Sequence, residues 1–533
     1  MRTTITNKVQ TYMSSVALFK DSAATNNLFA GLNIANANAA FINTRLGTTN
    51  NIVVDSGDGT EDTIYYKSEF STLEEMVLAK RALAEEIASE GTVLFKNNGA
   101  LPLNISSENV TLWGLNSHFP TLGGMIGSST TVDTENGQPS YGIEEAFTER
   151  GFNLNQTMID LYSSDAAQAY ARRGFGQTGH GLSPAFTATY ANQSEYPVGE
   201  IPASLYTDDI LKSADSTAAI VVISRDSSEA ADYYPTETNT TEGDYYERPL
   251  ALSDYERDMI SLAKKHSTKV IVLINADNAI EIEELKNDDE IDAIVWAGEP
   301  GVYGFLGVAD VISGEVNPSG HISDTYAVDS TSSPAMANFG MYEYTNSSNQ
   351  GGNLTETNKA DWYLVENEGI YVGYKYYETR YEDSVLGQGN ADSSVGATQG
   401  SQWVYEDEVT YPFGYGLSYT TFEQKLTNVS LSAGEEGTAT VTVKNTGDVE
   451  GKSVVQLYVQ APYISGGVEK ASIQLIGYGK TSVLEPGESE TVTVSFDPQY
   501  MASYDDSNGG AWILDAGDYY FAVGNGAHEA LNN

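Results

Sequence analysis

Cysteine is absent from the 533-residue sequence. This absence excludes disulfide bonds, thiol nucleophiles and metal sites built on cysteine. Long apolar runs are also missing, since nowhere do about 18 apolar residues follow one another. The N-terminal residues also lack the sustained apolar segment of a signal peptide. The sequence as given is therefore expected to be soluble.

Basic residues are scarce: 27 Lys and Arg stand against 74 Asp and Glu, which gives a formal net charge of −47. A surface this acidic repels phosphate backbones and anionic lipids, so nucleic acids and membrane surfaces are not expected as partners. An uncharged ligand such as a sugar meets no such repulsion. The acidity and the polar N-terminal segment favour an extracellular or cell-surface location, with a cytoplasmic one left open. Self-association into a homo-oligomer is also compatible with this composition.

Histidine is rare, and the histidines are scattered along the chain. They form no HExxH motif and no pair at i, i+4, and the sequence has no G-x-S-x-G motif. Metal-dependent hydrolysis and serine-esterase chemistry are therefore not supported, and we expect neither a metal nor a cofactor. The five histidines are His118, His180, His266, His321 and His528.

One stretch, GFGQTG at residues 174–179, matches the dinucleotide-binding fingerprint G-x-G-x-x-G. That motif holds a pyrophosphate only where a strand enters the glycine loop and a helix leaves it. Here the preceding residues have helical character and the following ones do not. We therefore interpret the stretch as a glycine-rich loop without a cofactor.

The composition is that of a folded protein, with 40% hydrophobic and 11% aromatic residues. Residues 1–70 are interpreted as an irregular leader. From residue 71 to 325, apolar strands alternate with amphipathic helices, which predicts a mostly parallel sheet with helices on both faces, an α/β sandwich. Capping-box signatures at Ser71-Thr72 and at Ser253 mark two helix starts. The predicted strands are 92–95, 110–115, 218–223, 269–275 and 293–296, and the predicted helices are 71–91, 141–150, 253–266 and 304–312.

The pattern changes in the last third of the chain. Residues 326–422 are rich in Tyr, Ser and Gly and are interpreted as a connector packed on the sandwich. Residues 423–533 contain stretches that alternate apolar and polar residues, such as TATVTVKN and SETVTVSF, separated by turns. Short period-two strands without helical spacing predict an all-β sandwich.

A lone acid follows the most apolar of the predicted strands. The run AAIVVI at 218–223 stops at Ser224, and Glu229 comes five residues later among small side chains. In open parallel sheets, ligands bind in the crevice beyond the carboxyl ends of the strands. Position alone leaves open whether Glu229 is functional or a solvated surface acid, and neighbouring carboxylates compete for the role. These are Asp226, Asp232, Glu237, Glu242 and Asp244.

Several motifs in order along the chain resemble glycoside hydrolase family 3, the β-glucosidase and β-xylosidase family. The resemblance covers roughly residues 71–526 and implies an α/β-sandwich domain followed by a fibronectin-III-like domain. The matching stretches are RALAEEIASEGTVLFKNNGALPL (81–103), AGEPGVYGFLGVADVISGEVNPSGHISDTY (297–326), YVGYKYYETR (371–380) and YPFGYGLSYTTF (411–422).

The resemblance implies a retaining, exo-acting hydrolase that removes terminal β-linked sugars from oligosaccharides or glycosides with two carboxyl groups. The loop Ser224–Ala230, SRDSSEA, resembles the family's S-R-x-S-G-E-G segment. Glu229 then occupies the position of the general acid/base. Arg225, Asp226 and Ser228 are the expected substrate-binding residues. Ser228 and Ala230 stand where the family often has glycine.

The family's second carboxyl group, an aspartate nucleophile, belongs to a (β/α)8 barrel. No stretch of this sequence reads as a barrel, and the nearest lookalike, Asp361 in the connector, is given no role. Some family members place sandwich, fibronectin-like domain and barrel in that order, and this chain fits the first two parts. We expect a fragment or one half of a two-chain enzyme, inactive alone, whose barrel domain or second chain carries the nucleophile.

A different class of function stays open. The 35 tyrosines could present ring faces to sugars, because an aromatic ring offers an apolar face beside a polar hydroxyl. The alternative expectation is a non-catalytic carbohydrate-binding or structural cell-surface module.

Overall fold

The structure is a computed structural model that describes residues 69–70, 72–123, 141–171, 198–225, 233, 244–337, 339, 342–343, 362–363, 365–366, 368–388, 403–432, 434–507 and 509–533. Residues 1–82 and residues 83–533 form two compact units. Nearly all of the predicted leader and the glycine loop at 174–179 lie outside the described ranges. No described helix is both long and apolar enough to cross a lipid bilayer.

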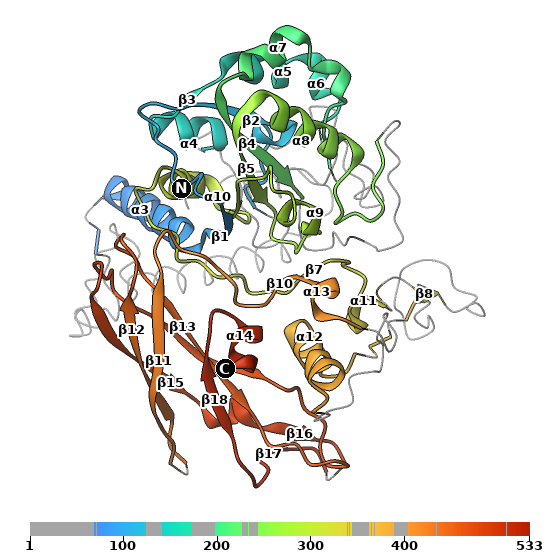
Figure 1. Cartoon of the computed structure of the whole chain (residues 1–533), viewed down its shortest axis with the longest axis vertical. Helices are drawn as coiled ribbons and strands as arrows, with labels where there is room; N and C mark the ends of the chain where they lie inside the picture. The colour runs from blue at the N-terminus through green and yellow to red at the C-terminus, as the bar shows by residue number, and fades with distance from the viewer. Residues whose placement is uncertain are drawn as a thin grey trace, which may run out of the picture. The chain divides into compact units, whose positions relative to one another are not determined.

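A sheet of six described strands lies at the centre of the first domain (Figure 1). Its strands pair in parallel except β1, which runs antiparallel to β6 at one edge. The expected mostly parallel sheet is thereby confirmed. In spatial order the strands are β1 (Val93–Asn97), β6 (Ala293–Trp296), β5 (Ser267–Asn275), β4 (Thr217–Ser224), β2 (Asn109–Trp113) and β3 (Asn153–Leu154).

Strand β4 is buried along its whole length. Val221 belongs to a hydrophobic cluster on one face of the sheet, and Ile220 and Val222 belong to a cluster on the other. Successive side chains of a strand point to opposite faces. A strand covered on both faces therefore requires apolar side chains throughout, which explains the unbroken run at 218–223.

Helices cover both faces of this sheet. Met259 of α8 (Asp254–His266) lies in the same cluster as Val221. Phe305 of α10 (Gly301–Ser313) lies in the same cluster as Ile220. The predicted three-layer α/β sandwich is therefore confirmed. Further helices of this domain are α4 (Ile143–Glu149), α5 (Gln156–Tyr162), α6 (Asp165–Gln168), α7 (Asp208–Ala214) and α9 (Glu283–Lys286).

Capping boxes begin both α3 (Leu73–Gly91) and α8, as the sequence predicts. In α8 the Ser253 hydroxyl accepts from the Glu256 backbone N–H at 3.2 Å, and the Glu256 carboxylate accepts from the Ser253 N–H at 2.9 Å. Thr72 and Glu75 make the same reciprocal pair at the start of α3. Each box satisfies backbone donors that the first helical turn leaves without partners.

The packed face of α3 differs from its most apolar face. Leu83 and Ile87 are 55% and 62% exposed. The helix instead meets α10 through backbone: a Cβ atom added to Gly307 would meet the Glu85 carbonyl and lie 2.7 Å from the Ser89 nitrogen. A glycine therefore lets the two helices approach closely at this point. The apolar spacing correctly predicted the helix but does not mark its buried side.

The connector forms a small core of its own, built mainly from tyrosines. Strand β7 (Tyr326–Ala327) pairs with β10 (Val409–Tyr411), and α12 (Tyr374–Tyr381) packs beside them. Glu378 of α12 is fully buried and accepts hydrogen bonds from the Tyr405 hydroxyl at 2.6 Å and from His528 Nδ1 at 2.8 Å. His528 belongs to the last helix, α14 (Ala527–Asn532), so this carboxylate joins the connector to the end of the chain.

The C-terminal domain is an antiparallel β-sandwich. Apolar residues from its two three-stranded sheets form one core, in which Val441 of one sheet and Leu457 of the other are both fully buried. One sheet consists of β11 (Phe422–Ser430), β12 (Gly437–Asn445) and β15 (Ser489–Phe496). The other consists of β14 (Gln474–Lys480), β13 (Val454–Gln460) and β18 (Tyr520–Val523). A short hairpin of β16 (Ser503–Asp505) and β17 (Ala511–Ile513) comes between β15 and β18 in the sequence.

Charged and polar contacts join the two domains. Glu90, in the last turn of α3, accepts from the ammonium groups of both Lys452 and Lys480, which belong to the C-terminal domain. The Asn317 amide of the first domain donates to the Glu450 carbonyl of the C-terminal domain at 2.8 Å. The two domains within residues 83–533 are therefore held together by specific side-chain contacts.

Candidate active site at the carboxyl end of strand β4

A network of short polar side chains ties the carboxyl ends of neighbouring strands together. The Ser224 hydroxyl donates to the Asn275 carbonyl at 2.7 Å, across the β4–β5 pair. The Asn275 side chain accepts from the Thr121 N–H at 2.7 Å and donates to the Thr121 and Gly298 carbonyls at 2.9 and 2.7 Å. All three side chains are buried. One asparagine thereby fixes the segments that leave β2, β5 and β6.

The topology places the end of β4 where a ligand crevice is expected. The chain leaves β2 toward β3 on one side and returns to β4 on the other, so the direction of winding switches between β2 and β4. Open α/β sheets bind ligands at such switch points, outside the carboxyl ends of the strands. Gly114 turns the chain away from β2 with φ 96°, and a Cβ atom there would lie 2.8 Å from the Val222 carbonyl of β4.

The predicted acid/base residue follows this strand end. Residues 226–232 lie outside the described ranges, so Glu229, Asp226 and Ser228 are among the predicted site residues whose positions the structure does not describe. Asp361 also lies outside them. The described structure therefore defines the two anchors of this loop, at Arg225 and from residue 244 onward.

Arg225 joins the two ends of the loop. Its side chain is fully buried, and its guanidinium donates to the Ser224, Pro249 and Ala251 carbonyls at 2.9, 2.9 and 2.7 Å. It also donates to both carboxylate oxygens of Glu256 at 2.7 and 2.9 Å. These contacts use all five N–H groups of the guanidinium. The geometry therefore favours a structural role for Arg225 over the expected contact with substrate, since no donor remains.

The electrostatics of this pair fit that role. Burial lowers the pKa of Arg225, but the Glu256 carboxylate outweighs burial and the net pKa shift is upward. The guanidinium is thus charged at any pH at which the protein is folded. Glu256 itself also completes the capping box of α8, so the helix start, the strand end and the loop anchor share one carboxylate.

The returning end of the loop is held by further carboxylates. Arg248 forms a bidentate ion pair with Glu281, with both N–O distances 2.7 Å. Asp244 is buried and accepts from the Tyr255 N–H at 2.9 Å. Burial raises the pKa of Asp244 to about 6. Asp244 was one of the acids that the sequence left open for the role proposed for Glu229. Its hydrogen bond to the backbone at the start of α8 is a structural contact.

A buried acid that the sequence did not reveal lies beside β2. Glu200 accepts from the backbone N–H groups of Leu115 and Ile201 at 2.9 and 2.8 Å, and the Tyr206 hydroxyl lies 3.4 Å away. Burial raises its pKa to about 8, so the carboxyl is largely protonated at neutral pH. Its stretch, Pro197–Pro202, has no periodicity that would predict a buried acid. Only the fold brings it beneath the turn at Gly114.

Comparison with known proteins accounts for both domains. Residues 92–419 match the glycosyl hydrolase family 3 C-terminal domain, which is more than half of the chain. Residues 453–527 match the fibronectin type III-like domain. The order of the two matches is that of the two domains in the structure.

Two of the curated relatives that match this chain are β-glucosidases. The β-glucosidase of Ruminococcus albus is 30% identical over 453 residues, which are 84% of this chain and 39% of the relative. β-Glucosidase A of Butyrivibrio fibrisolvens is 35% identical over 299 residues, which are 53% of this chain and 30% of the relative. The chain thus spans well under half the length of these two proteins.

Solved structures give the same result. A β-glucosidase from Paenibacillus barengoltzii matches with a TM-score of 0.64 and 29% identity, covering 84% of this chain and 42% of that one. β-Glucosidase 3B from Thermotoga neapolitana matches with a TM-score of 0.62 and 28% identity, covering 87% of this chain and 54% of that one. The matched domains, their order and these relatives confirm the resemblance seen in the motifs, and the chain belongs to glycosyl hydrolase family 3.

Proposed function

We propose that this chain is the acid/base-bearing part of a retaining, exo-acting glycoside hydrolase that removes terminal β-linked sugars. Glu229 is the general acid/base. The nucleophilic aspartate belongs to a barrel domain or second chain outside this sequence, and the chain alone is inactive. The observation that carries the proposal is the anchored loop: a buried guanidinium joins both of its ends at the switch point of the sheet.

The mechanism assigns two successive tasks to Glu229. In the first step its carboxyl group protonates the glycosidic oxygen while the external aspartate attacks the anomeric carbon, which breaks the glycosidic bond and forms a glycosyl-enzyme ester. In the second step the same group, now a carboxylate, removes a proton from water, and that water cleaves the ester. The two carboxyl groups of a retaining pair lie about 5 to 5.5 Å apart. The contacts of Arg225 therefore have to fix the position of Glu229 relative to the nucleophile to well within that separation.

Asp226 and Ser228 are the proposed substrate contacts of this loop. Both lie between Arg225 and Glu229 in the sequence, so they are the residues nearest to the proposed acid on the same segment. Arg225 is proposed as the residue that positions the loop, because its N–H groups are all engaged within the domain.

Leaving-group dependence tests the role of Glu229. The assay combines this chain with a family barrel, supplied as a fusion or as a second chain. In this assembled enzyme, Glu229→Ala is expected to lower kcat/KM for a methylumbelliferyl β-glucoside by about 10²- to 10⁴-fold, which is the rate enhancement that a general acid usually contributes. For a dinitrophenyl β-glucoside, whose leaving group needs no proton, kcat/KM should fall far less, because the bond-breaking step does not depend on a general acid. Asp232→Ala is the matched control.

Two outcomes would count against this assignment. One is an equal loss on both substrates in Glu229→Ala, which would mean that the residue does not donate a proton to the leaving group. The other is the selective loss appearing in Asp232→Ala instead, which would move the role to that neighbouring acid.

A second candidate, the carbohydrate-binding module, is favoured by one observation. Tyr504 of β16 and Trp512 of β17 face each other across the hairpin, 51% and 69% exposed, with ring centroids 5.4 Å apart. Exposed aromatic rings of this kind can stack on sugar faces. Isothermal titration with cello- and xylo-oligosaccharides tests it: binding lost in Trp512→Ala and kept in Tyr478→Ala supports the module, and no binding heat contradicts it.

A further inference from the structure

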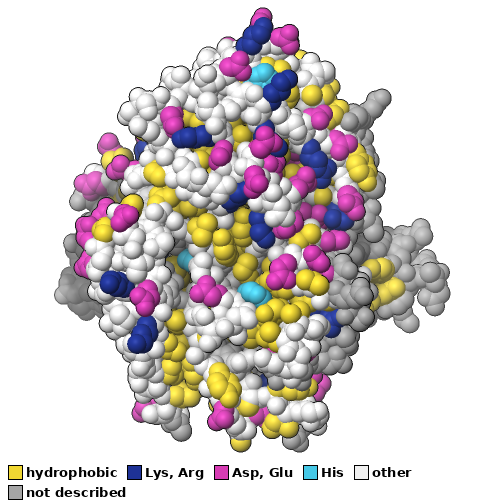
Figure 2. All heavy atoms as spheres, viewed as in Figure 1, with side chains coloured by type: hydrophobic (Ala, Val, Ile, Leu, Met, Phe, Trp, Pro, Cys, Tyr) yellow, Lys and Arg dark blue, Asp and Glu magenta, His cyan; other side chains and the backbone are white. Residues whose placement is uncertain are grey.

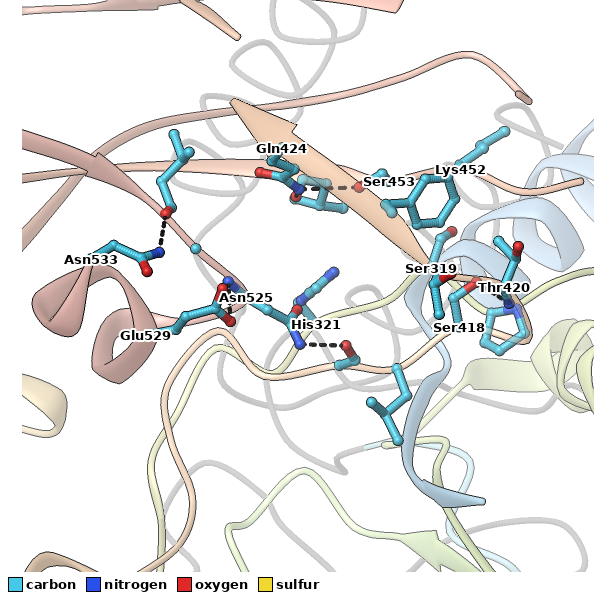
Figure 3. Close-up of a pocket in the computed structure, with 18 residues that line it drawn as sticks. Ser319, His321, Ser418, Thr420, Gln424, Lys452, Ser453, Asn525, Glu529 and Asn533 are labelled. Carbon is cyan, nitrogen blue, oxygen red and sulfur yellow. Dashed lines mark hydrogen bonds between the residues drawn. The ribbon is translucent and has the colours of Figure 1, made fainter. Parts of the chain in front are cut away.

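A polar pocket lies where the chain passes from the first domain into the C-terminal one. Its volume is about 370 Å³, which falls within the range of small-molecule sites, roughly 300 to 1,000 Å³. Figure 3 shows labelled side chains from both domains around the same space. Ser319 and His321 come from the first domain, Ser418 and Thr420 from the linking segment, and Gln424 from β11. The remaining polar lining residues are Thr421, Lys452, Ser453, Asn525, Glu529 and Asn533.

The imidazole and side-chain amide groups of His321, Asn525 and Gln424 donate hydrogen bonds within the protein. His321 Nδ1 donates to the Gly414 carbonyl at 2.7 Å, and the Asn525 amide donates to the Gly416 carbonyl at 2.9 Å. The Gln424 amide donates to the Val454 carbonyl at 2.8 Å and to Ser453 Oγ at 3.1 Å. The side chains are thereby fixed in place by backbone carbonyls, which is the property of a preformed site.

Acceptors of the same side chains are left over. A carbonyl cannot donate, so His321 carries its proton on Nδ1 and keeps a lone pair on Nε2. Burial lowers the pKa of His321, which keeps the ring neutral. The Oε1 atom of Gln424 is buried and has no hydrogen-bond partner. Among the described residues, Asn525 Oδ1 has no hydrogen-bond donor, and Glu529 accepts through one of its two carboxylate oxygens, from the Asn525 N–H at 3.1 Å. A lining rich in acceptors selects a ligand with several O–H groups.

The charge of the lining excludes an anion. Lys452 is the basic side chain of the lining, and its ammonium is paired with Glu90. Glu529 adds a negative charge. Acidic side chains are spread over the face drawn in Figure 2, with the fewer basic ones among them. A phosphorylated or carboxylated ligand would therefore meet repulsion, whereas a neutral one would not.

Apolar side chains supply the remaining wall of the pocket. Leu417, Phe422 and Val523 line it beside the polar groups. A pyranose ring has the complementary pattern, with C–H groups on its faces and hydroxyls at its edge, and aromatic rings pack against such faces. We propose that this pocket, whose lining includes no residue of strand β4, is a binding site for a neutral monosaccharide.

Two exposed threonines provide a matched test. Thr421 lines the pocket, and Thr446 does not. The hydroxyl groups of the two residues form a hydrogen bond at 2.9 Å. Thr421→Trp adds an indole ring to the lining of the pocket, and Thr446→Trp breaks the same hydroxyl pair and adds the same ring at a residue that does not line it. Binding of D-glucose and D-xylose to the full chain is measured by saturation-transfer NMR and calorimetry. D-gluconate serves as the anionic probe of similar size, and circular dichroism checks that both variants fold.

The wild-type chain and Thr446→Trp are expected to bind a neutral monosaccharide with Kd on the order of 1 mM, and Thr421→Trp at least about tenfold more weakly. Gluconate should bind at least about tenfold more weakly than glucose to the wild-type chain. Three results overturn the proposal: no saturable binding of either sugar, equal affinity in the two tryptophan variants, or gluconate binding as tightly as glucose.

Discussion

Arg225 and Glu256 form a fully buried bidentate ion pair, with N–O distances of 2.7 and 2.9 Å. Arg225 directly follows strand β4, and Glu256 lies in the first turn of α8. The pair therefore closes the segment that carries the proposed acid/base residue. It also joins a strand and a helix that are separate in the sequence.

Breaking this pair should cost much more stability than breaking an exposed one. Glu256→Gln leaves a buried guanidinium without its counter-charge and is expected to lower the free energy of unfolding by about 3–5 kcal/mol. Glu284→Gln removes the partner of Arg257 in a half-exposed pair at 2.8 Å and should cost no more than about 1 kcal/mol. Urea unfolding followed by circular dichroism measures both. Equal, small losses would mean that the buried pair does not anchor this region.

Glu200 should make stability fall as pH rises. Its folded pKa, about 8, lies above the ordinary value of 4.5. Between these two pH values the unfolded chain loses the proton and the folded chain keeps it, so the free energy of unfolding decreases with pH. At 1.36 kcal/mol per pH unit the decrease is on the order of 4 kcal/mol.

Glu200→Gln separates that slope from the loss of hydrogen bonds. The amide does not titrate, so its lost acceptor lowers stability by a constant amount. The difference in free energy of unfolding between the wild-type chain and the variant should therefore decrease by about 4 kcal/mol from pH 4.5 to pH 8. Denaturant unfolding at half-unit pH steps measures the difference. A difference that does not change with pH would show that Glu200 titrates normally in the folded protein.

Glu90 should show the opposite pH dependence. Burial raises the pKa of Glu90, but Lys452 and Lys480 outweigh burial, and the net pKa shift is downward. A carboxyl whose pKa is lower in the folded state stabilises the protein above its unfolded pKa and loses this contribution as pH falls through the folded value. Glu90→Gln is expected to cost about 1–3 kcal/mol at pH 7, as for a hydrogen bond to a charged group. The cost should shrink toward pH 3.

The neighbouring residue Glu86 supplies the control for that experiment. It is exposed on the same helix, so Glu86→Gln should change stability by less than about 0.5 kcal/mol at either pH. Thermal unfolding at pH 7 and at pH 3.5 distinguishes the two variants. The ion-pair interpretation of the domain junction would be wrong if both variants behaved alike.

The chain alone should not turn over a glycoside. Because the proposed mechanism places the nucleophile outside this sequence and a retaining mechanism requires both carboxyl groups, the purified chain is expected to hydrolyse an aryl β-glucoside at no more than the background rate. Product release at 400 nm from a nitrophenyl glucoside measures it. Robust turnover that Glu229→Gln abolishes would show that this sequence carries its own nucleophile.

The sequence predicted the parts of the fold that follow from local patterns. The apolar run of β4 required burial on both faces, and Ser253 with Glu256 marked the start of α8. These features depend on residues a few positions apart. Gly314, which ends α10 in the left-handed conformation, is of the same kind.

The contacts that the sequence missed are those that only the fold brings together. Arg225 was expected to contact substrate, and nothing in its neighbourhood announces a partner 31 residues later. Glu200 meets the turn after β2, 85 residues earlier in the chain. Ile87 has the spacing of a core residue but is exposed, because glycine lets α10 lie on the backbone of α3. The position of Glu229 stays a prediction from the motif alone.

The anchoring of the loop at Arg225 has a consequence for evolution and engineering. Its N–H groups grip backbone carbonyls at Pro249 and Ala251, which any amino-acid sequence would present. Between these carbonyls and Arg225, the buried Asp244 and the Arg248–Glu281 ion pair belong to the scaffold, so a segment exchanged between family members has to keep these residues. Transplanting the corresponding segment from another family member would alter the chemistry at the strand end while leaving the scaffold as it is.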